Sequence, residues 1–260
     1  MKRMGLVLFV ALLSATMAFG YKTGTVTLDE LIGTTNTTGL LVGDKVFYDF
    51  WFTPTIGCQG SSSTTGCSGF PTSPSQVTVQ GVGTGTVPDP YGIQFISGFN
   101  ATSTGTLPAV ADFLLKYTVE TINGLPLING IGQAYVGGVA SGGGSILINE
   151  QVYAGGYLVG SPIASSQLEL TDKNDPPGEI IQGDQLVINP PLNKVYVVKD
   201  ILLVANAACQ DGAQPPCTAN TASLSLVRQT VHQVPEPGFY GVLALGLSGL
   251  VLAFRRRRTN

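Results

Sequence analysis

Short apolar runs of strand length, separated by turn-forming residues, are the main pattern of this 260-residue sequence. The clearest run is DFLLKYTVE at residues 112–120, where Phe113, Leu115, Tyr117 and Val119 alternate with mostly polar residues. Successive side chains of a strand point to opposite faces, so this alternation predicts a strand with one buried face. Similar patterns predict strands at residues 45–52, 76–82, 92–96, 131–139, 145–153, 179–188, 194–204 and 222–231.

The gaps between these runs hold turn formers, such as Asn-Gly at residues 123–124 and 129–130. No long stretch has helical periodicity, and no strand alternates with a helix-length segment. The sequence therefore predicts an all-β fold, an antiparallel β-sandwich or jelly-roll, in one exported domain at residues 21–231. The loops at 53–75 and 209–220 are predicted to be insertions in this domain.

The N-terminus has the three parts of a secretory signal peptide at residues 1–20. Lys2 and Arg3 are followed by an apolar stretch at 4–13 and by small residues at Ala18 and Gly20. This predicts export by the secretory translocon and cleavage by signal peptidase near residue 20. A retained membrane anchor is the alternative, but the apolar run is shorter than the roughly 20 residues of a spanning helix.

The C-terminus predicts a membrane span. Residues 238–254 contain no charge, and a basic cluster follows them, formed by Arg255, Arg256, Arg257 and Arg258. Positive-inside bias would hold this cluster in the cytoplasm, so the chain before the transmembrane helix lies across the membrane. Residues 232–234 are predicted to form a tether between the last strand and this C-terminal segment, which spans residues 232–260.

The exported part of the chain is acidic. Residues 21–234 carry seven basic and fifteen acidic side chains, a net charge of −8, although the whole chain has a net charge of −3. Such a surface lacks the basic patch that nucleic acid or an anionic membrane would require. It favours solubility and suits divalent cations or cationic partners.

Four cysteines in an exported chain favour disulfides. Three pairings are open, and the two close spacings favour Cys58 with Cys67 and Cys209 with Cys217. Each bond would close a short loop and contribute on the order of 2–3 kcal/mol. A zinc site does not fit, because the sequence has no C-x2-C pair and its single histidine lies elsewhere.

Catalytic motifs are missing from the sequence. The only histidine, His232, falls in the predicted tether, where a catalytic base could not be held rigidly. There is no G-x-S-x-G or H-E-x-x-H sequence, and the glycine runs lack the Lys and Ser/Thr of a phosphate loop. The sequence predicts a protein that is not an enzyme and that needs no cofactor.

Two weaker patterns could bind ligands. Asp49 and Trp51 would share a face of the strand FYDFWF, where a sugar could stack and hydrogen-bond; in the alternative, Phe47 and Trp51 cap the core. The oxygen-rich run with Asp172, Asn174 and Asp175 could bind calcium, although it lacks the glycine and glutamate of an EF-hand. The alternative for this run is a solvated turn.

The segment VPEPGFYGVLALGLSGLVLAFRRRR resembles the C-terminal signal of PEP-CTERM proteins. Pro235, Glu236 and Pro237 match the motif, residues 238–254 the membrane helix, and the four arginines the basic stop. The two prolines disfavour helix around Glu236, so the Pro-Glu-Pro tripeptide is expected to stay extended. The alternative, a plain membrane anchor at the C-terminus, would not need this tripeptide. The resemblance implies an exosortase as partner, processing near the motif, and a Gram-negative bacterium that makes exopolysaccharide.

This resemblance covers only the end of the chain and concerns its destination. It implies a precursor anchored in the inner membrane, then a location in the envelope, at the outer surface or in the extracellular matrix. The first hypothesis is a structural or adhesive protein of the surface or exopolysaccharide matrix. The alternative is an extracellular carbohydrate-binding or glycan-active domain that carries the same signal.

Overall fold

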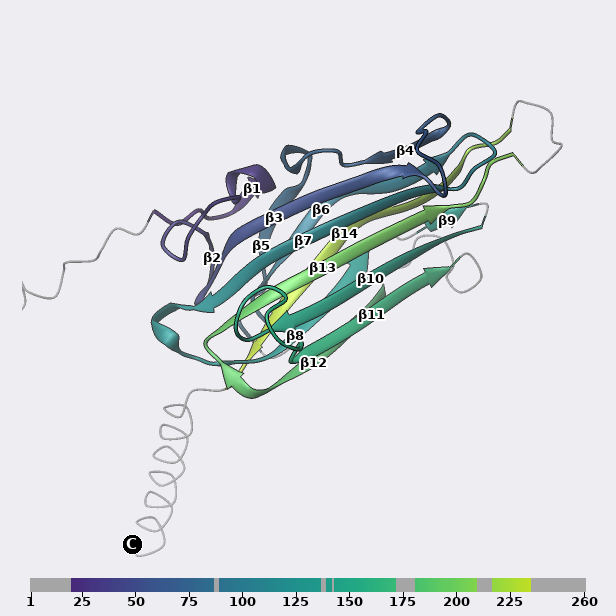
Figure 1. Ribbon diagram of the computed structural model, residues 1–260. Helices are drawn as coiled ribbons and strands as arrows, with labels where there is room; N and C mark the ends of the chain where they lie inside the picture. The colour runs from purple at the N-terminus through teal and green to yellow at the C-terminus, as the bar shows by residue number, and fades with distance from the viewer. Residues whose placement is uncertain are drawn as a thin grey trace, which may run out of the picture.

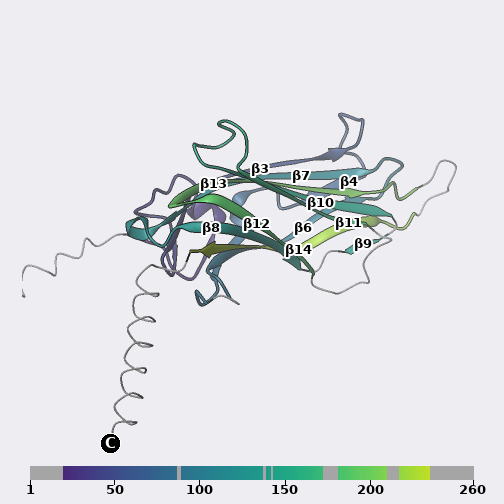
Figure 2. The same cartoon turned by 90° about the horizontal axis from the view of Figure 1, so that it is seen from below.

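Two antiparallel β-sheets packed face to face form the computed structural model of the protein (Figures 1 and 2). The structure describes residues 20–86, 89–136, 139–141, 143–171, 181–209 and 217–234. Helical structure in these ranges consists of three short 3-10 helices, η1 (Leu28–Glu30), η2 (Pro74–Gln76) and η3 (Ile122–Gly124). The predicted all-β antiparallel sandwich is confirmed.

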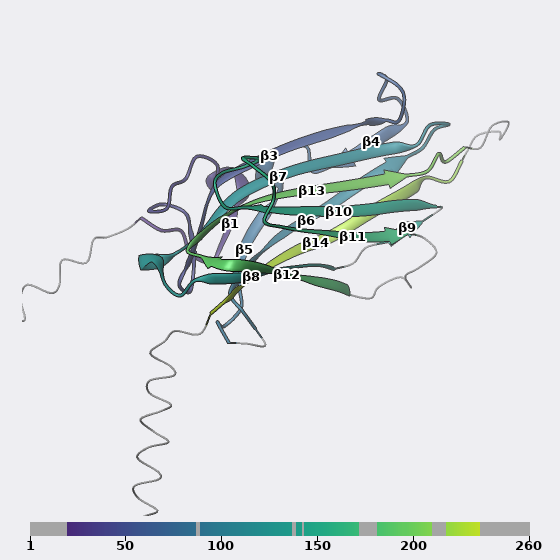
Figure 3. The ribbon, with the colours of Figure 1, turned by 60° about the horizontal axis from the view of Figure 1, so that its bottom comes forward.

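The six-stranded sheet has the order β11-β10-β13-β7-β3-β2, and Figure 3 shows β3, β7, β13, β10 and β11 following one another across one layer. Its strands are β2 (Leu40–Val42), β3 (Lys45–Cys58), β7 (Ala109–Thr121), β10 (Gly144–Tyr153), β11 (Ala164–Thr171) and β13 (Lys194–Ala205).

The eight-stranded sheet has the order β1-β5-β6-β14-β8-β12, with β4 beside β6 and β9 beside β14. Its strands are β1 (Thr25–Thr27), β4 (Cys67–Phe70), β5 (Thr78–Val82), β6 (Gly92–Ser103), β8 (Ile128–Val136), β9 (Val139–Ser141), β12 (Ile181–Leu192) and β14 (Asn220–Gln233). The order in space departs from the order in sequence, so most neighbours in this sheet are distant along the chain.

Strand β7 lies near the centre of the sandwich and follows its sequence pattern closely. Phe113, Leu115, Tyr117 and Val119 are all buried, and the strand pairs with β3 on one side and β13 on the other. Aromatic rings from β3, β6 and β7 fill the space between the two sheets beneath these three strands. Phe113, for example, stacks on Phe52 at 6.1 Å and meets Phe99 edge to face at 5.3 Å.

The expected insertion at residues 53–75 is wrong in its extent. Strand β3 continues to Cys58, and β4 begins at Cys67, because β7 and β6 provide pairing partners along these polar stretches. The loop is therefore confined to the residues between two strand ends, which the Cys58–Cys67 disulfide joins with a Cα separation of 5.4 Å. The second predicted disulfide, Cys209–Cys217, is also confirmed.

The last strand is longer than its pattern predicts. β14 includes His232 and Gln233, which pair with Gly130 and Ile128 of β8, and Val234 N donates to Leu127 O at 2.9 Å. The expectation that residues 232–234 form a free tether is wrong, because the neighbouring strand satisfies their backbone groups. The sheet therefore extends to within one residue of Pro235.

Other differences concern strands with weak apolar patterns. The described residues of the strand expected at 131–139 lie in β8 and β9, which pair with β14 in one register. The strand expected at 92–96 continues as β6 to Ser103. Strands β1, β2 and β11 have no equivalent among the predictions. These segments are short or rich in polar residues, and partner strands decide their conformation.

Within the described residues, no helix is long and apolar enough to cross a membrane. The predicted transmembrane helix at 238–254 and all but the last residue of the predicted signal peptide at 1–20 lie outside the described residues. Both stay predictions, as does the division into residues 1–20, 21–231 and 232–260.

Candidate functional site

Trp51 lies exposed on the outer face of the six-stranded sheet, with 58% of its surface accessible. Its indole Nε1 donates to Thr53 Oγ1 at 2.8 Å, which fixes the orientation of the ring on β3. The alternative in which Trp51 caps the core is wrong, although Phe47 is buried as that alternative required. A flat aromatic side chain is thus presented to solvent.

A β-bulge at Asp49 explains the exposure of Trp51. The pairing of β3 with β7 shifts its register between Tyr48 and Trp51, and Asp49 has a positive φ of 55°. The extra residue resets the alternation, so Phe47 and Phe50 are both buried. Asp49 is exposed within the bulge, outside the alternation that placed it beside Trp51; their joint contact with a sugar stays a prediction.

The connection between β10 and β11, residues 154–163, folds over this outer face, and Figure 2 shows it rising from the six-stranded layer on the side away from the other sheet. The Tyr157 hydroxyl donates to Asp49 O at 2.9 Å and contacts Thr118 Oγ1 at 2.8 Å. Its ring meets that of Tyr196 edge to face at 5.3 Å. The connection therefore reaches the bulge of β3.

A groove of about 690 Å³ lies on the same face beside this connection. Its lining residues come from β7, β10, β11, β13 and the connection, and most are polar: Leu114, Asn149, Glu150, Gln151, Leu158, Ser165, Ser166, Gln167, Val198 and Asp200. The side chain of Glu150 is itself buried, and the Ser166 hydroxyl is bonded to Gln133. Amide and hydroxyl groups that alternate along strands present hydrogen-bond donors and acceptors in a row. Such a surface suits a polar, uncharged ligand.

Trp51 belongs to the same face as this groove. It is the register partner of Lys116, Lys116 is that of Val198, and Val198 is that of Gln151. Adjacent strands lie about 4.8 Å apart, so Trp51 and Val198 are separated by about 10 Å. An extended ligand could contact both the ring and the groove.

A carboxyl pair lies at the edge of the groove. Burial, together with hydrogen bonding to Asp200 and the charge of that carboxyl, raises the pKa of Asp112 to about 6. The two residues lie on adjacent strands, where Asp112 is the register partner of Leu202 and Asp200 that of Leu114. The nearby charge of Asp200 therefore adds to burial in disfavouring ionisation of Asp112.

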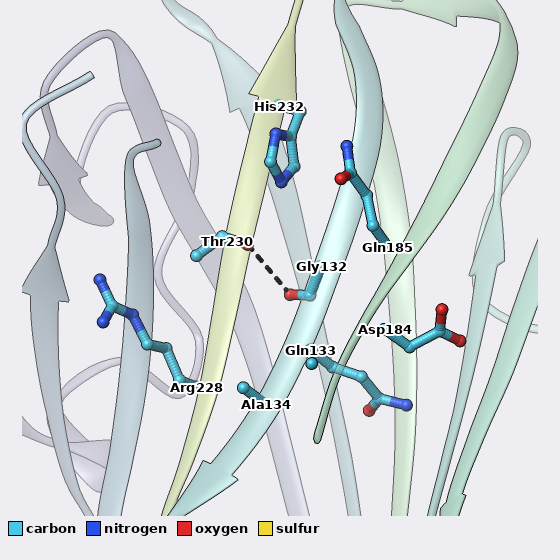
Figure 4. Close-up of a pocket in the computed structure, with 9 residues that line it drawn as sticks. Gly132, Gln133, Ala134, Asp184, Gln185, Arg228, Thr230 and His232 are labelled. Atoms are coloured by element: carbon cyan, nitrogen blue, oxygen red, sulfur yellow. Dashed lines mark hydrogen bonds between the residues drawn. The ribbon is translucent and has the colours of Figure 1, made fainter. Parts of the chain in front are cut away.

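A second, smaller groove of about 250 Å³ lies on the outer face of the eight-stranded sheet (Figure 4). Gly132 and Ala134 of β8 form its floor, between Thr230 and His232 of β14 and Gln185 of β12. A Cβ on Gly132 would lie 2.6 Å from Thr230 Oγ1, so the floor requires glycine. Burial lowers the pKa of His232.

The other predicted sites lie outside the described residues. They are the motif Pro235, Glu236 and Pro237, the basic stop Arg255, Arg256, Arg257 and Arg258, and the calcium candidates Asp172, Asn174 and Asp175. In the part of the chain that the structure describes, no three His, Cys, Asp or Glu side chains converge as metal ligands.

Comparison with solved structures finds proteins of low similarity. A carbohydrate-binding module of the β-sandwich superfamily has 10% identity and a TM-score of 0.29, and the alignment covers 71% of this chain and 57% of that one. The enzymatically active domain of bacteriophage CBA120 tailspike protein 4 has 11% identity and a TM-score of 0.24, with 69% and 19% covered.

A family 11 carbohydrate-binding module from Clostridium thermocellum, in complex with a mixed-linked tetrasaccharide, has 10% identity and a TM-score of 0.17. That alignment covers 73% of this chain and 99% of the module. Similarities at this level carry no functional argument, and the fold assignment rests on the strand pairing described above.

No curated protein sequence matches this chain. The model of the PEP-CTERM protein-sorting motif matches residues 233–258, the segment that begins at the last residue of β14. The match covers the Pro-Glu-Pro step, the uncharged run and the four arginines. The chain therefore carries a PEP-CTERM protein-sorting motif, which begins at the last residue of the final strand of the β-sandwich.

Proposed function

We propose that this is an exported surface protein, processed by an exosortase, whose sandwich has a structural or adhesive role in the envelope or exopolysaccharide matrix. The observation that carries this proposal is the complete sorting signal at 233–258, which follows the last strand without a spacer. No cofactor and no catalytic step are required for this role. The membrane holds the precursor through the C-terminal segment until processing.

The end of β14 is held in the sandwich by hydrogen bonds, and these bonds fix where the new C-terminus would lie after processing. Gln233 Oε1 accepts from the buried Lys45 Nζ, and Val234 N donates to Leu127 O. A protein cut near Pro235 would keep both contacts, because they involve residues on the N-terminal side of the motif. The new C-terminus would therefore project from a rigid edge of the domain.

The test is the mass of the protein recovered from envelope and medium, for the wild type and for a variant with Pro235, Glu236 and Pro237 changed to alanine. We expect the wild type to lack the signal peptide and the C-terminal helix, and the variant to keep that helix. A matched control changes Arg255, Arg256, Arg257 and Arg258 to lysine, and should be processed, because positive-inside bias depends on charge. An intact C-terminus in the wild type would contradict the proposal.

A second candidate function is glycan binding by the outer face of the six-stranded sheet. The observation that favours it is the exposure of Trp51, since a tryptophan at 58% exposure presents a large apolar ring to solvent. The nearby groove supplies the amides of Asn149, Gln151 and Gln167. Aromatic stacking combined with polar contacts is the chemistry that recognises a sugar chain.

The glycan candidate is tested with exopolysaccharide isolated from the producing cells, by affinity electrophoresis. Trp51→Ala should weaken retention at least about tenfold, the equivalent of about 1.4 kcal/mol, whereas Trp51→Phe should keep part of it. The matched control is Leu125→Ala, which removes another exposed apolar side chain away from the groove. Equal retention of the wild type and Trp51→Ala would exclude this face as the glycan site.

A further inference from the structure

Three polar side chains meet in the core between the two sheets. Lys199 Nζ of β13 lies 2.6 Å from Glu150 Oε2 of β10 and 2.6 Å from Gln133 Oε1 of β8. Their exposed fractions are 0%, 1% and 2%, so an amine, a carboxyl and a carboxamide are enclosed together. β13 and β10 belong to the six-stranded sheet and β8 to the other, so the group bridges the sandwich.

The surrounding contacts hold the carboxamide and the carboxyl in place. Gln133 Nε2 donates to Ser166 Oγ, which leaves its carbonyl oxygen directed at the amine. Gln229 Nε2 donates to Gly132 O at 2.8 Å and lies 3.4 Å from Glu150 Oε1. The three groups are therefore positioned by neighbours, which is the arrangement that converts a slow bimolecular reaction into a fast intramolecular one.

A buried ion pair is a poor source of stability by itself, because desolvation of the two charges offsets their attraction. Apolar side chains of similar volume would serve the core equally well, and Val197 and Ile201 flank Lys199 on the same face of β13. Burial lowers the pKa of Lys199, although the Glu150 carboxylate opposes that shift. The lowered pKa favours the neutral amine, which is the nucleophilic form.

We propose that Lys199 and Gln133 form an intramolecular isopeptide bond, with Glu150 as the catalytic residue that carries the proton. The Nζ lone pair attacks Cδ of Gln133, and the carbonyl electrons move onto Oε1. Glu150 accepts a proton from Nζ and transfers it to Nε2. The Cδ–Nε2 bond then breaks, ammonia leaves, and the carbonyl forms again. The amine and the carboxamide supply every atom, so no oxidant or co-reactant is needed.

The product would join the two sheets covalently through the core. The bond connects β8 to β13, and it closes a loop from residue 133 to residue 199 that no disulfide of the described chain encloses. A cross-link acts chiefly by restricting the unfolded chain, and its effect grows with the length of the loop. The reaction occurs once per molecule and leaves a protein that resists unfolding, which suits the surface role proposed above.

The experiment is a tryptic peptide map of the exported protein, purified in folded form, then reduced and alkylated. A bond at Lys199 blocks cleavage there, so we expect peptide 117–173 joined to peptide 195–228, lighter than the two together by one ammonia molecule. Release of free peptide 195–199 in full yield from the folded wild type would overturn the proposal.

Three variants test the role of Glu150, provide a control for it, and test the identity of the reacting atoms. Glu150→Gln should give the separate peptides, whereas the control Glu169→Gln, an exposed acid on β11, should stay cross-linked. If Glu150→Gln stays cross-linked, the assigned proton carrier is wrong. Gln133→Glu should form the same bond with loss of water in place of ammonia, so a linked pair with that mass confirms the two atoms that react.

Discussion

The interior of the sandwich has an aromatic end and a polar end. Beneath β3, β6 and β7 the rings of Phe50, Phe95 and Tyr117 pack at centroid distances of 5.4–6.3 Å. Between β8, β10, β13 and β14 the core instead contains Lys199, Glu150 and two glutamines. The aromatic end gains its stability from burial and packing, whereas the polar end must offset the desolvation of its groups. The bond proposed between Lys199 and Gln133 would give the polar end a chemical role that the aromatic end lacks.

The largest effect on folding is expected at the aromatic end. Phe113→Ala should reduce the free energy of unfolding by about 3–5 kcal/mol, because it removes a fully buried ring and leaves a cavity. Denaturant unfolding measures the loss. The control is Leu114→Ala on the opposite face of β7, which should cost less. Equal losses would show that the aromatic packing contributes no more than the outer face.

Tyr117 contacts both the aromatic end and the polar end of the interior. Its substitution is expected to have the next largest effect on the free energy of unfolding. Its ring stacks on Phe50 at 5.4 Å, and its hydroxyl donates to Gln229 Oε1 at 2.9 Å. Tyr117→Phe keeps the ring and leaves a buried amide oxygen without this donor, which should cost about 1–3 kcal/mol in unfolding free energy. The cost should fall in the double variant with Gln229→Leu. Additive losses in the double variant would show that the two ends are not coupled through this bond.

The smallest effect on stability is expected from Asp112, a carboxyl on the outer face whose surroundings can be compared with those of Glu150. Glu150 has Lys199 as a partner, whereas Asp112 has another acid, Asp200. The pKa of Asp112 rises from 3.8 to about 6 on folding, so the folded protein binds this proton more tightly than the unfolded chain. The resulting stabilisation is complete below pH 3.8 and is lost as the pH rises through about 6.

Asp112→Asn should therefore flatten the dependence of the melting temperature on pH between about 4 and 7. The matched control is Asp184→Asn on the other sheet, which should leave that dependence unchanged. A wild type that becomes more stable as the pH rises through 6 would contradict the assignment to Asp112.

The sequence predicted the fold class and the disulfides well, because both depend on local features. Alternation along β7 identified a buried face, and short cysteine spacings identified both pairs. Strand ends were predicted less well. His232 was expected in a tether because it lies only three residues before Pro235, and it lies in β14 because β8 pairs with it.

The contacts of the polar core could not be predicted from local sequence patterns either. Lys199 has a visible sequence signal, a charge at a position of β13 where Val197 and Ile201 face the core. Its partners Glu150 and Gln133 are 49 and 66 residues away in sequence. No periodicity relates positions on three different strands, so only the pairing of the sheets brings them together.

The sequence by itself determined the features that depend on neighbouring residues: an all-β chain, two close cysteine pairs, an excess of acidic residues at 21–234 and a PEP-CTERM sorting motif. The tertiary structure alone decided that Trp51 is exposed, because one bulged residue at Asp49 reverses the faces of β3. It also decided that an amine, a carboxyl and a carboxamide are buried together between the sheets. Local patterns fix the period of side chains along a strand, whereas register and sheet order, set by long-range pairing, fix which side chains meet.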